Sequence, residues 1–189
     1  MFHSKAIRFA ALASAIALAV GCGDERVPSK TNLESALNRD YAQSADCLFA
    51  KAVRFPYELS VSDKLLFETR HRLDAMVDAG LLSREATATQ DGIVNRYSLT
   101  ARGVKAAGDG RFCYGRREVT SVEKFTQPVD YRGMPLTTVN YRFVLKNQAN
   151  WSRDARVRDA FPSLAVADSE QPVDEATVVY TQDGWVLTY

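Results

Sequence analysis

The spacing of apolar positions predicts that the chain begins with helices and continues with strands. The first amphipathic helix is indicated by apolar residues at three- or four-residue spacing on one face, at Leu33, Leu37, Tyr41 and Leu48. A capping box at 31–34 marks its expected start. Pro56 disfavours helical geometry at the residue before it, so the helix is expected to end there and to give way to an extended piece over 55–59.

A second helix is expected after Ser60 or Ser62, which are both good N-terminal caps. Its apolar face consists of Leu65, Leu66, Leu73, Met76 and Val77. Gly80 supplies a stop signal. The strands expected over 81–86 and 93–99 should pair as a hairpin, because Asp91-Gly92 between them is a strong turn signal. A third helix, over 101–107, can be capped by Thr100.

In the second half, apolar and polar residues alternate, which is typical of half-buried strands. The clearest strand is 137–145, and a weaker one covers 118–125. Asp183-Gly184 predicts a hairpin between 176–181 and 185–189. The remaining segments are expected to be a helix over 151–161 that Pro162 stops, a loop or wide turn over 127–135, and a loop over 165–176. Together these elements predict an antiparallel sheet with one covering helix over residues 113–189.

The first residues have the layout of a secretory signal. Lys5 and Arg8 precede or interrupt an apolar run that ends at Val20, too short to span a membrane as a helix. The stretch 18–22 resembles a bacterial lipoprotein box. The resemblance implies a signal peptide over 1–21, a lipidated Cys22 as first mature residue, and a position facing the periplasm. In bacterial lipoproteins, aspartate in second position favours retention in the inner membrane. Here Asp24 would be third after processing, so the resemblance implies the outer membrane rather than the inner one. Residues 22–30 are polar and are expected to form a tether.

Composition and charge fit a globular protein of ordinary kind. Of 189 residues, 46% are hydrophobic and 25% are charged. Without Lys5 and Arg8, 22 of the 24 basic residues remain against 23 acidic ones. A nearly neutral chain has no bulk electrostatic attraction to nucleic acid, so a nucleic-acid partner is not expected.

The three cysteines divide into one lipidation site and one pair. With Cys22 assigned to lipid, Cys47 and Cys113 remain, and two cysteines in an oxidising compartment usually form a disulfide. The alternative is two separate buried thiols. A bridge between them would enclose everything from the first helix to the start of the C-terminal sheet.

A further resemblance covers residues 73–103. Leu73 to Leu82, then Asp91-Gly92, then 97–103 (Tyr-Ser-Leu-Thr-Ala-Arg-Gly), is similar to the helix and wing of bacterial winged-helix regulators. The resemblance implies a winged-helix-like part over 31–112, so the predicted fold class is α+β. DNA binding would require two helices before the wing, yet only 16 residues separate Pro56 from Leu73. A structural or protein-binding use of the scaffold is therefore expected, and DNA binding remains the alternative if the chain is not exported.

No motif for catalysis, metal binding or a cofactor is recognised. His71 is the one histidine after the signal, and neither a zinc-ligand pattern nor a phosphate or dinucleotide loop occurs. The expected role is therefore non-catalytic: binding or assisting another envelope protein, with no cofactor and no metal. An envelope hydrolase that acts on glycan or peptide through acidic residues is the alternative. The candidate partner-binding residues are aromatic, and each could instead belong to the core: Tyr131, Tyr141, Trp151 and Trp185.

Overall fold

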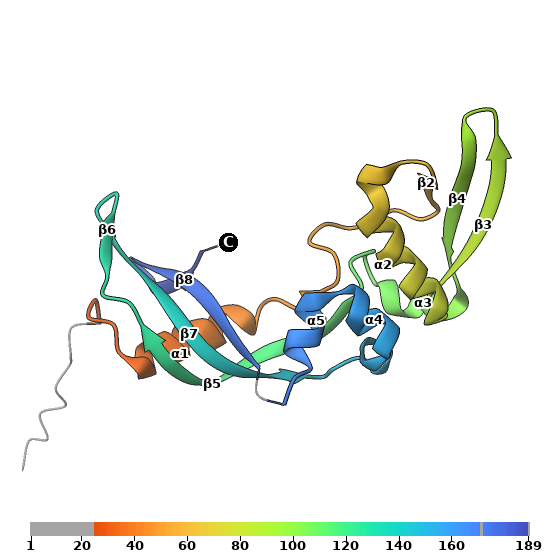
Figure 1. The fold of residues 1–189 in the computed structure, drawn as a ribbon. Helices are drawn as coiled ribbons and strands as arrows, with labels where there is room; N and C mark the ends of the chain where they lie inside the picture. The colour runs from red at the N-terminus through yellow and green to blue at the C-terminus, as the bar shows by residue number, and fades with distance from the viewer. Residues whose placement is uncertain (1–24, 171, 189) are drawn as a thin grey trace, which may run out of the picture.

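The computed structural model describes residues 25–170 and 172–188 (Figure 1). The expected signal peptide and Cys22 lie outside these residues. Within them the fold is α+β, as the sequence predicts at this level: a large curled antiparallel sheet, a second, smaller sheet and five α-helices.

The large sheet has the strand order β1-β5-β7-β8-β9, with β6 paired to β7. All its pairings are antiparallel. Its strands are β1 (Asp46–Cys47), β5 (Cys113–Phe125), β6 (Val129–Tyr131), β7 (Met134–Lys146), β8 (Val173–Thr181) and β9 (Gly184–Leu187). Alternation along β7 is as expected, because Val139, Tyr141 and Phe143 all point into the core. The hairpin predicted at Asp183-Gly184 is confirmed as β8–β9.

Helix α1 (Lys30–Tyr41) lies across one face of this sheet, against β5 and β9 (Figure 1). It buries Leu33, Ala36 and Leu37. Its capping box is formed by Ser29 and Asn32, so the helix starts before the predicted box at 31–34. The predicted extension toward Pro56 is wrong, since the helix ends at Tyr41. The cause is a distant contact: Asp46–Cys47 pairs with β5, and the N–H of Leu48 donates to the carbonyl oxygen of Phe112 at 3.1 Å.

The small sheet has the order β2-β4-β3, with β2 (Tyr57–Ser60), β4 (Gly92–Leu99) and β3 (Leu82–Thr89). The extended piece at 55–59, the hairpin at Asp91-Gly92 and the helix α3 (Ala101–Ala107) capped by Thr100 are confirmed. The second helix starts later than expected. A short 3-10 turn, η1 (Lys64–Leu66), is capped by Asp63, and α2 (Phe67–Asp78) follows. Gly80 ends that helix with φ +70°, as predicted.

Several expectations for residues 127–176 are wrong. The loop at 127–135 contains β6 and turns into β7. The single helix at 151–161 is two elements, η2 (Asn150–Arg153) and α4 (Ala155–Ala160). A helix does end before Pro162, since α4 stops at Ala160, but Pro162 also begins a new one, α5 (Pro162–Ala167), because proline fits the first helical turn where no N–H partner is needed. The loop expected at 165–176 is shortened accordingly, from α5 to β8.

One core connects the two sheets. Helix α4 packs against α2, and buried side chains form a single cluster that includes Leu73 and Met76 of α2 and Phe143 of β7. Phe112, between α3 and β5, contacts Phe49, Phe55 and Trp151 edge to face. Helix α1, which the sequence assigns to the first part, packs on the sheet of the second.

Candidate functional site

Cys47 and Cys113 lie at disulfide distance, as predicted. Their sulfur atoms are 2.07 Å apart, and the two residues are paired between β1 and β5. The bridge holds the segment after α1 against the start of the long strand β5.

The four candidate partner-binding aromatics do not form one surface. Tyr141, Trp151 and Trp185 are buried in the core. The indole N–H of Trp185 donates to the carbonyl oxygen of Glu25 at 3.0 Å. Only Tyr131 is accessible, with 51% of its surface exposed on β6. Three of the four therefore belong to the core, the alternative left open for each. Alternation on β7 turns Tyr141 inward, and Trp151 of η2 packs on Phe112.

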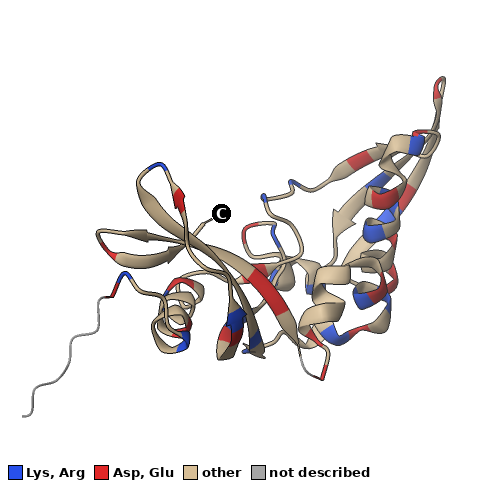
Figure 2. Cartoon of the chain, turned by 60° about the vertical axis from the view of Figure 1, so that its left-hand side comes forward, with Lys and Arg blue, Asp and Glu red and all other residues tan. Residues whose placement is uncertain are grey.

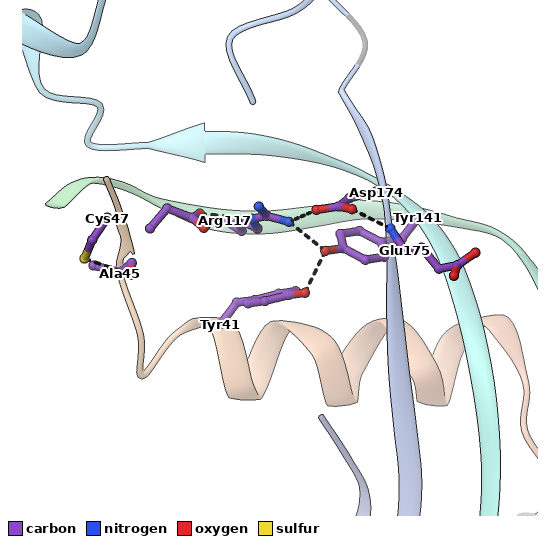
Figure 3. Close-up of polar contacts among 8 residues, drawn as sticks. Tyr41, Ala45, Cys47, Arg117, Tyr141, Asp174 and Glu175 are labelled. Atoms are coloured by element: carbon purple, nitrogen blue, oxygen red, sulfur yellow. Dashed lines mark hydrogen bonds and ion pairs between the residues drawn. The ribbon is translucent and has the colours of Figure 1, made fainter. Parts of the chain in front are cut away.

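The most concentrated polar group in the described residues surrounds Arg117 on β5 (Figure 3). Its Nε donates to both carboxylate oxygens of Asp46, at 3.0 Å each. Its Nη1 donates to the hydroxyl of Tyr141 at 2.9 Å and also to Asp174 on β8. The Arg117 side chain is 14% exposed. We call Arg117, Asp46, Asp174, Tyr41 and Tyr141 the arginine cluster.

Aromatic rings enclose the guanidinium of Arg117. Its carbon lies 4.5 Å from the ring centre of Phe143 and 5.7 Å from that of Tyr41. The hydroxyls of Tyr41 and Tyr141 are 2.6 Å apart and share a hydrogen bond. The cluster thus connects five elements of the chain, since its members come from α1, β1, β5, β7 and β8.

The pKa values in the cluster are displaced mainly by burial. Burial raises the pKa of Tyr41, and the hydrogen bond with Tyr141 raises it further. Burial also raises the pKa of Asp46, although Arg117 acts in the opposite direction. Burial alone would lower the pKa of Arg117, but Tyr141, Asp46 and Asp174 outweigh it and keep the guanidinium charged. The pKa of nearby Tyr114 rises to about 12, chiefly through burial.

The geometry of the arginine cluster suits a fixed connection between elements. The guanidinium lies between two carboxylates, so each carboxylate already accepts a hydrogen bond from Arg117 and shares its positive charge. Asp46 and Tyr41 also line a cavity of about 320 Å³ next to Cys47. No sequence motif predicts this cluster, because Asp46 and Asp174 are 71 and 57 residues away from Arg117 in the sequence.

A second feature is the outer edge of the β3–β4 hairpin. Strand β3 is at the edge of the small sheet, and within 25–170 and 172–188 no other strand pairs with that edge. Residues 83–89 are all exposed. The two-residue turn makes Thr89 and Gly92 the closing pair, so hydrogen bonds to β4 alternate from there. The backbone groups of Arg84, Ala86 and Ala88 therefore point away from β4, toward solvent.

A third feature is the tip of the β6–β7 hairpin. Val129, Tyr131 and Met134 are exposed there. A cavity of about 680 Å³ separates this tip from the β8–β9 turn, and its walls include Arg26, Met134 and Tyr180. The Arg26 guanidinium lies 5.9 Å from the ring centre of Tyr180.

Other chemistry is sparse in the described part of the chain. No group of three or more His, Cys, Asp or Glu residues there could hold a metal ion. His71 stacks on Phe67 on the surface of α2, with the two ring centres 6.5 Å apart. None of the described helices is long and apolar enough to cross a membrane. Comparisons with protein-family models, curated proteins and solved structures found no match to this chain.

Proposed function

We propose that this protein is a periplasm-facing lipoprotein, anchored through Cys22 with preference for the outer membrane, that binds another envelope protein without catalysing a reaction. The observation that carries the proposal is the unpaired edge of β3. An exposed strand edge presents a row of free N–H and C=O groups that can pair with an extended segment of another chain.

The sequence of β3 supports a docking role for its edge. Proteins usually protect such edges with lysine, proline or a bulge. From Ala86 to Thr89 the strand instead carries small alanine and threonine side chains, and its pairing with β4 has no bulge. This stretch is accessible, and its small side chains leave room for another backbone to approach.

The position of the hairpin fits an anchored protein. The described chain begins beside α1 and the β6–β7 hairpin, whereas the β3–β4 hairpin extends at the opposite end of the molecule (Figure 1). An anchor at Cys22 would therefore leave the β3 edge at the far end from the membrane. The occupant we infer is an extended segment of another protein, because eight residues of strand pairing bury far less than the ~1,600 Å² of a standard stable protein interface.

We infer that the small sheet with α2 and α3 is a winged-helix-like scaffold used for protein binding. The order β2-β4-β3, with a helix between β2 and β3 and a hairpin wing, supports this reading. Charge does not favour a nucleic-acid partner, because residues 63–103 hold six basic and six acidic residues, interleaved over α2 and the hairpin (Figure 2).

The test first identifies the partner by crosslinking and then compares its affinity for two variants of Ala86. A photocrosslinking amino acid placed at Ala88 in living cells identifies the partner, and the same label at Val144 on the large sheet is the control for non-specific capture. Affinity of the purified partner is then compared for Ala86→Pro, which removes an outward N–H, and Ala86→Thr, which keeps it. Binding should be lost with proline and kept with threonine, while both variants retain the melting temperature of the wild type to within a few degrees.

Three outcomes would overturn the proposal. The first is equal affinity of both Ala86 variants for the partner. The second is crosslinking at Ala88 that yields only a second copy of this chain. The third is a Cys22→Ser protein that fractionates with membranes as the wild type does, which would remove the anchor.

A further inference from the structure

An apolar row crosses the outer face of the large sheet, on the side opposite α1. On β7 the odd-numbered residues from Thr137 to Phe143 are buried toward the core, so the even-numbered ones face outward. Strand pairing continues this outward face from β6 to β9, since Val129 pairs with Leu136, Leu136 with Val179, and Val179 with Val186. Tyr131 and Met134 form the next pair toward the hairpin tip. The row consists of Val129, Tyr131, Met134, Leu136, Val179 and Val186.

The most accessible members of the row lie at the hairpin tip. Val129 is 59% exposed, Tyr131 51% and Met134 36%, whereas the other three are half-buried. The tip turns at Arg132 and Gly133, and the Arg132 guanidinium lies 5.4 Å from the ring centre of Tyr131. Further along the same face of β7 come the polar Asn140 and Arg142, which separate the row from the exposed Val144 and Val173 at the other end of the sheet.

The chain itself indicates what meets this end. Arg26 lines the cavity beside Met134, and Cys22 is four residues before it. Four residues span at most ~14 Å, so a lipid on Cys22 is held within that distance of Arg26. The bilayer that receives the lipid is thereby brought to the end of the molecule that carries the hairpin tip. Tyrosine beside arginine is a common combination at the membrane–water interface, where the ring is apolar and its hydroxyl remains hydrated.

We propose that the tip of the β6–β7 hairpin, with Val129, Tyr131 and Met134, is a second membrane contact that rests in the interfacial zone of the bilayer. This inference rests on the proposed anchoring through Cys22. Charge contributes little to the contact, because Asp130 and Glu25 offset Arg132 and Arg26 at this end. The contact fixes the orientation of the anchored protein and directs the β3–β4 hairpin away from the membrane.

The test places tryptophan at two exposed positions of the full, lipidated protein in phosphatidylethanolamine–phosphatidylglycerol vesicles that contain brominated acyl chains. Bromine quenches tryptophan fluorescence on contact. Tyr131→Trp is the probe, and Ile93→Trp, on the distant β4, is the matched control. The wild type supplies the background from the buried Trp151 and Trp185. We expect most of the added fluorescence to be quenched in Tyr131→Trp and none of it in Ile93→Trp.

The outcomes separate this inference from the proposed function. If neither probe is quenched while the protein remains bound to vesicles, the membrane contact is overturned and the anchor stays intact. If neither variant associates with vesicles and the wild type is found in the soluble fraction of cells, the anchor is overturned as well. A third outcome is that a second copy of the chain covers Trp at position 131 of Tyr131→Trp on the vesicle and shields it from bromine. Concentration-dependent crosslinking would reveal this, and it would also contradict the membrane contact.

Discussion

The Nε atom of Arg117 donates to both carboxylate oxygens of Asp46, at 3.0 Å each, across 71 residues of sequence. The interaction is next to the Cys47–Cys113 bridge, so the same two-residue strand β1 is held by a covalent and an ionic connection.

Arg117→Ala should lower the free energy of unfolding by about 3 kcal/mol, because it leaves the carboxylate of Asp46 half-buried without a counter-charge. Urea denaturation measures the change. The control is Lys146→Ala, which removes a partner of Glu118 from an ion pair that is half exposed on both sides. That change should stay within about 0.5 kcal/mol. Similar losses in both variants would mean that the arginine cluster has no special importance for the fold.

Asp46→Asn should alter how stability depends on pH. Because the folded-state pKa of Asp46 is raised above its ordinary value of 3.8, the stability it contributes is full below that value and is lost as pH rises through the folded pKa. Relative to wild type, Asp46→Asn should therefore become more stable as pH increases from about 3 to 7. Denaturation midpoints across that range provide the measurement.

The matched control for this pH dependence is Asp168→Asn. Hydrogen bonds from Gln148 and Arg158 hold the pKa of Asp168 below its usual range. Its contribution is present above the unfolded pKa and is lost as pH falls through the folded one, so Asp168→Asn should become less stable relative to wild type as pH rises. If both variants follow the same trend, the opposite signs inferred for the two carboxyls are wrong.

Asn38→Ala should destabilise the protein by about 2 kcal/mol. The Asn38 amide accepts from the N–H of Val119 at 2.7 Å and donates to its carbonyl oxygen at 3.0 Å. These backbone groups lie where the pairing of β5 with β7 shifts register between Val119 and Ser121, so the side chain replaces the missing ladder bonds. Ser35→Ala, on the exposed side of the same helix, should have little effect. Thermal denaturation of both variants tests the difference.

The double variant Cys47→Ala with Cys113→Ala should lose up to about 4 kcal/mol, since the bridge closes a long loop in the unfolded chain. The two cysteines are separated by 66 positions. Reduction of the wild type should produce the same shift in the urea midpoint, whereas reduction of the double variant should produce none. An unchanged midpoint in the double variant would contradict a stabilising role for the bridge.

Local signals predicted the local structure well. The cap at Thr100 is found where expected, and both hairpins are found, although their two-residue turns are 90–91 and 182–183, one position before the predicted pairs. The end of α1 was missed because pairing of β1 with β5 depends on residues far along the chain. The start of α5 was missed because proline is compatible with a first helical turn as well as with a helix end.

The candidate surfaces were harder to predict for the same reason. Arg117 is one of several charged residues in a strand, and nothing nearby in sequence identifies its partners. The apolar row emerges only when the register of four strands is known. The sequence also could not separate the exposed Tyr131 from the buried Tyr141 and Trp185, because that distinction depends on the packing of the folded chain.

The packing of α1 also constrains the order in which this protein can be completed. Helix α1, which carries the buried Leu33 and Leu37, packs against both β5 and β9, and Asp40 accepts a hydrogen bond from the N–H of Leu187. A chain emerging from a ribosome or a translocation channel presents α1 long before β9 exists. The helix must therefore wait for its full cover, and a chain that ended before residue 184 would lack the part of that cover that β9 supplies.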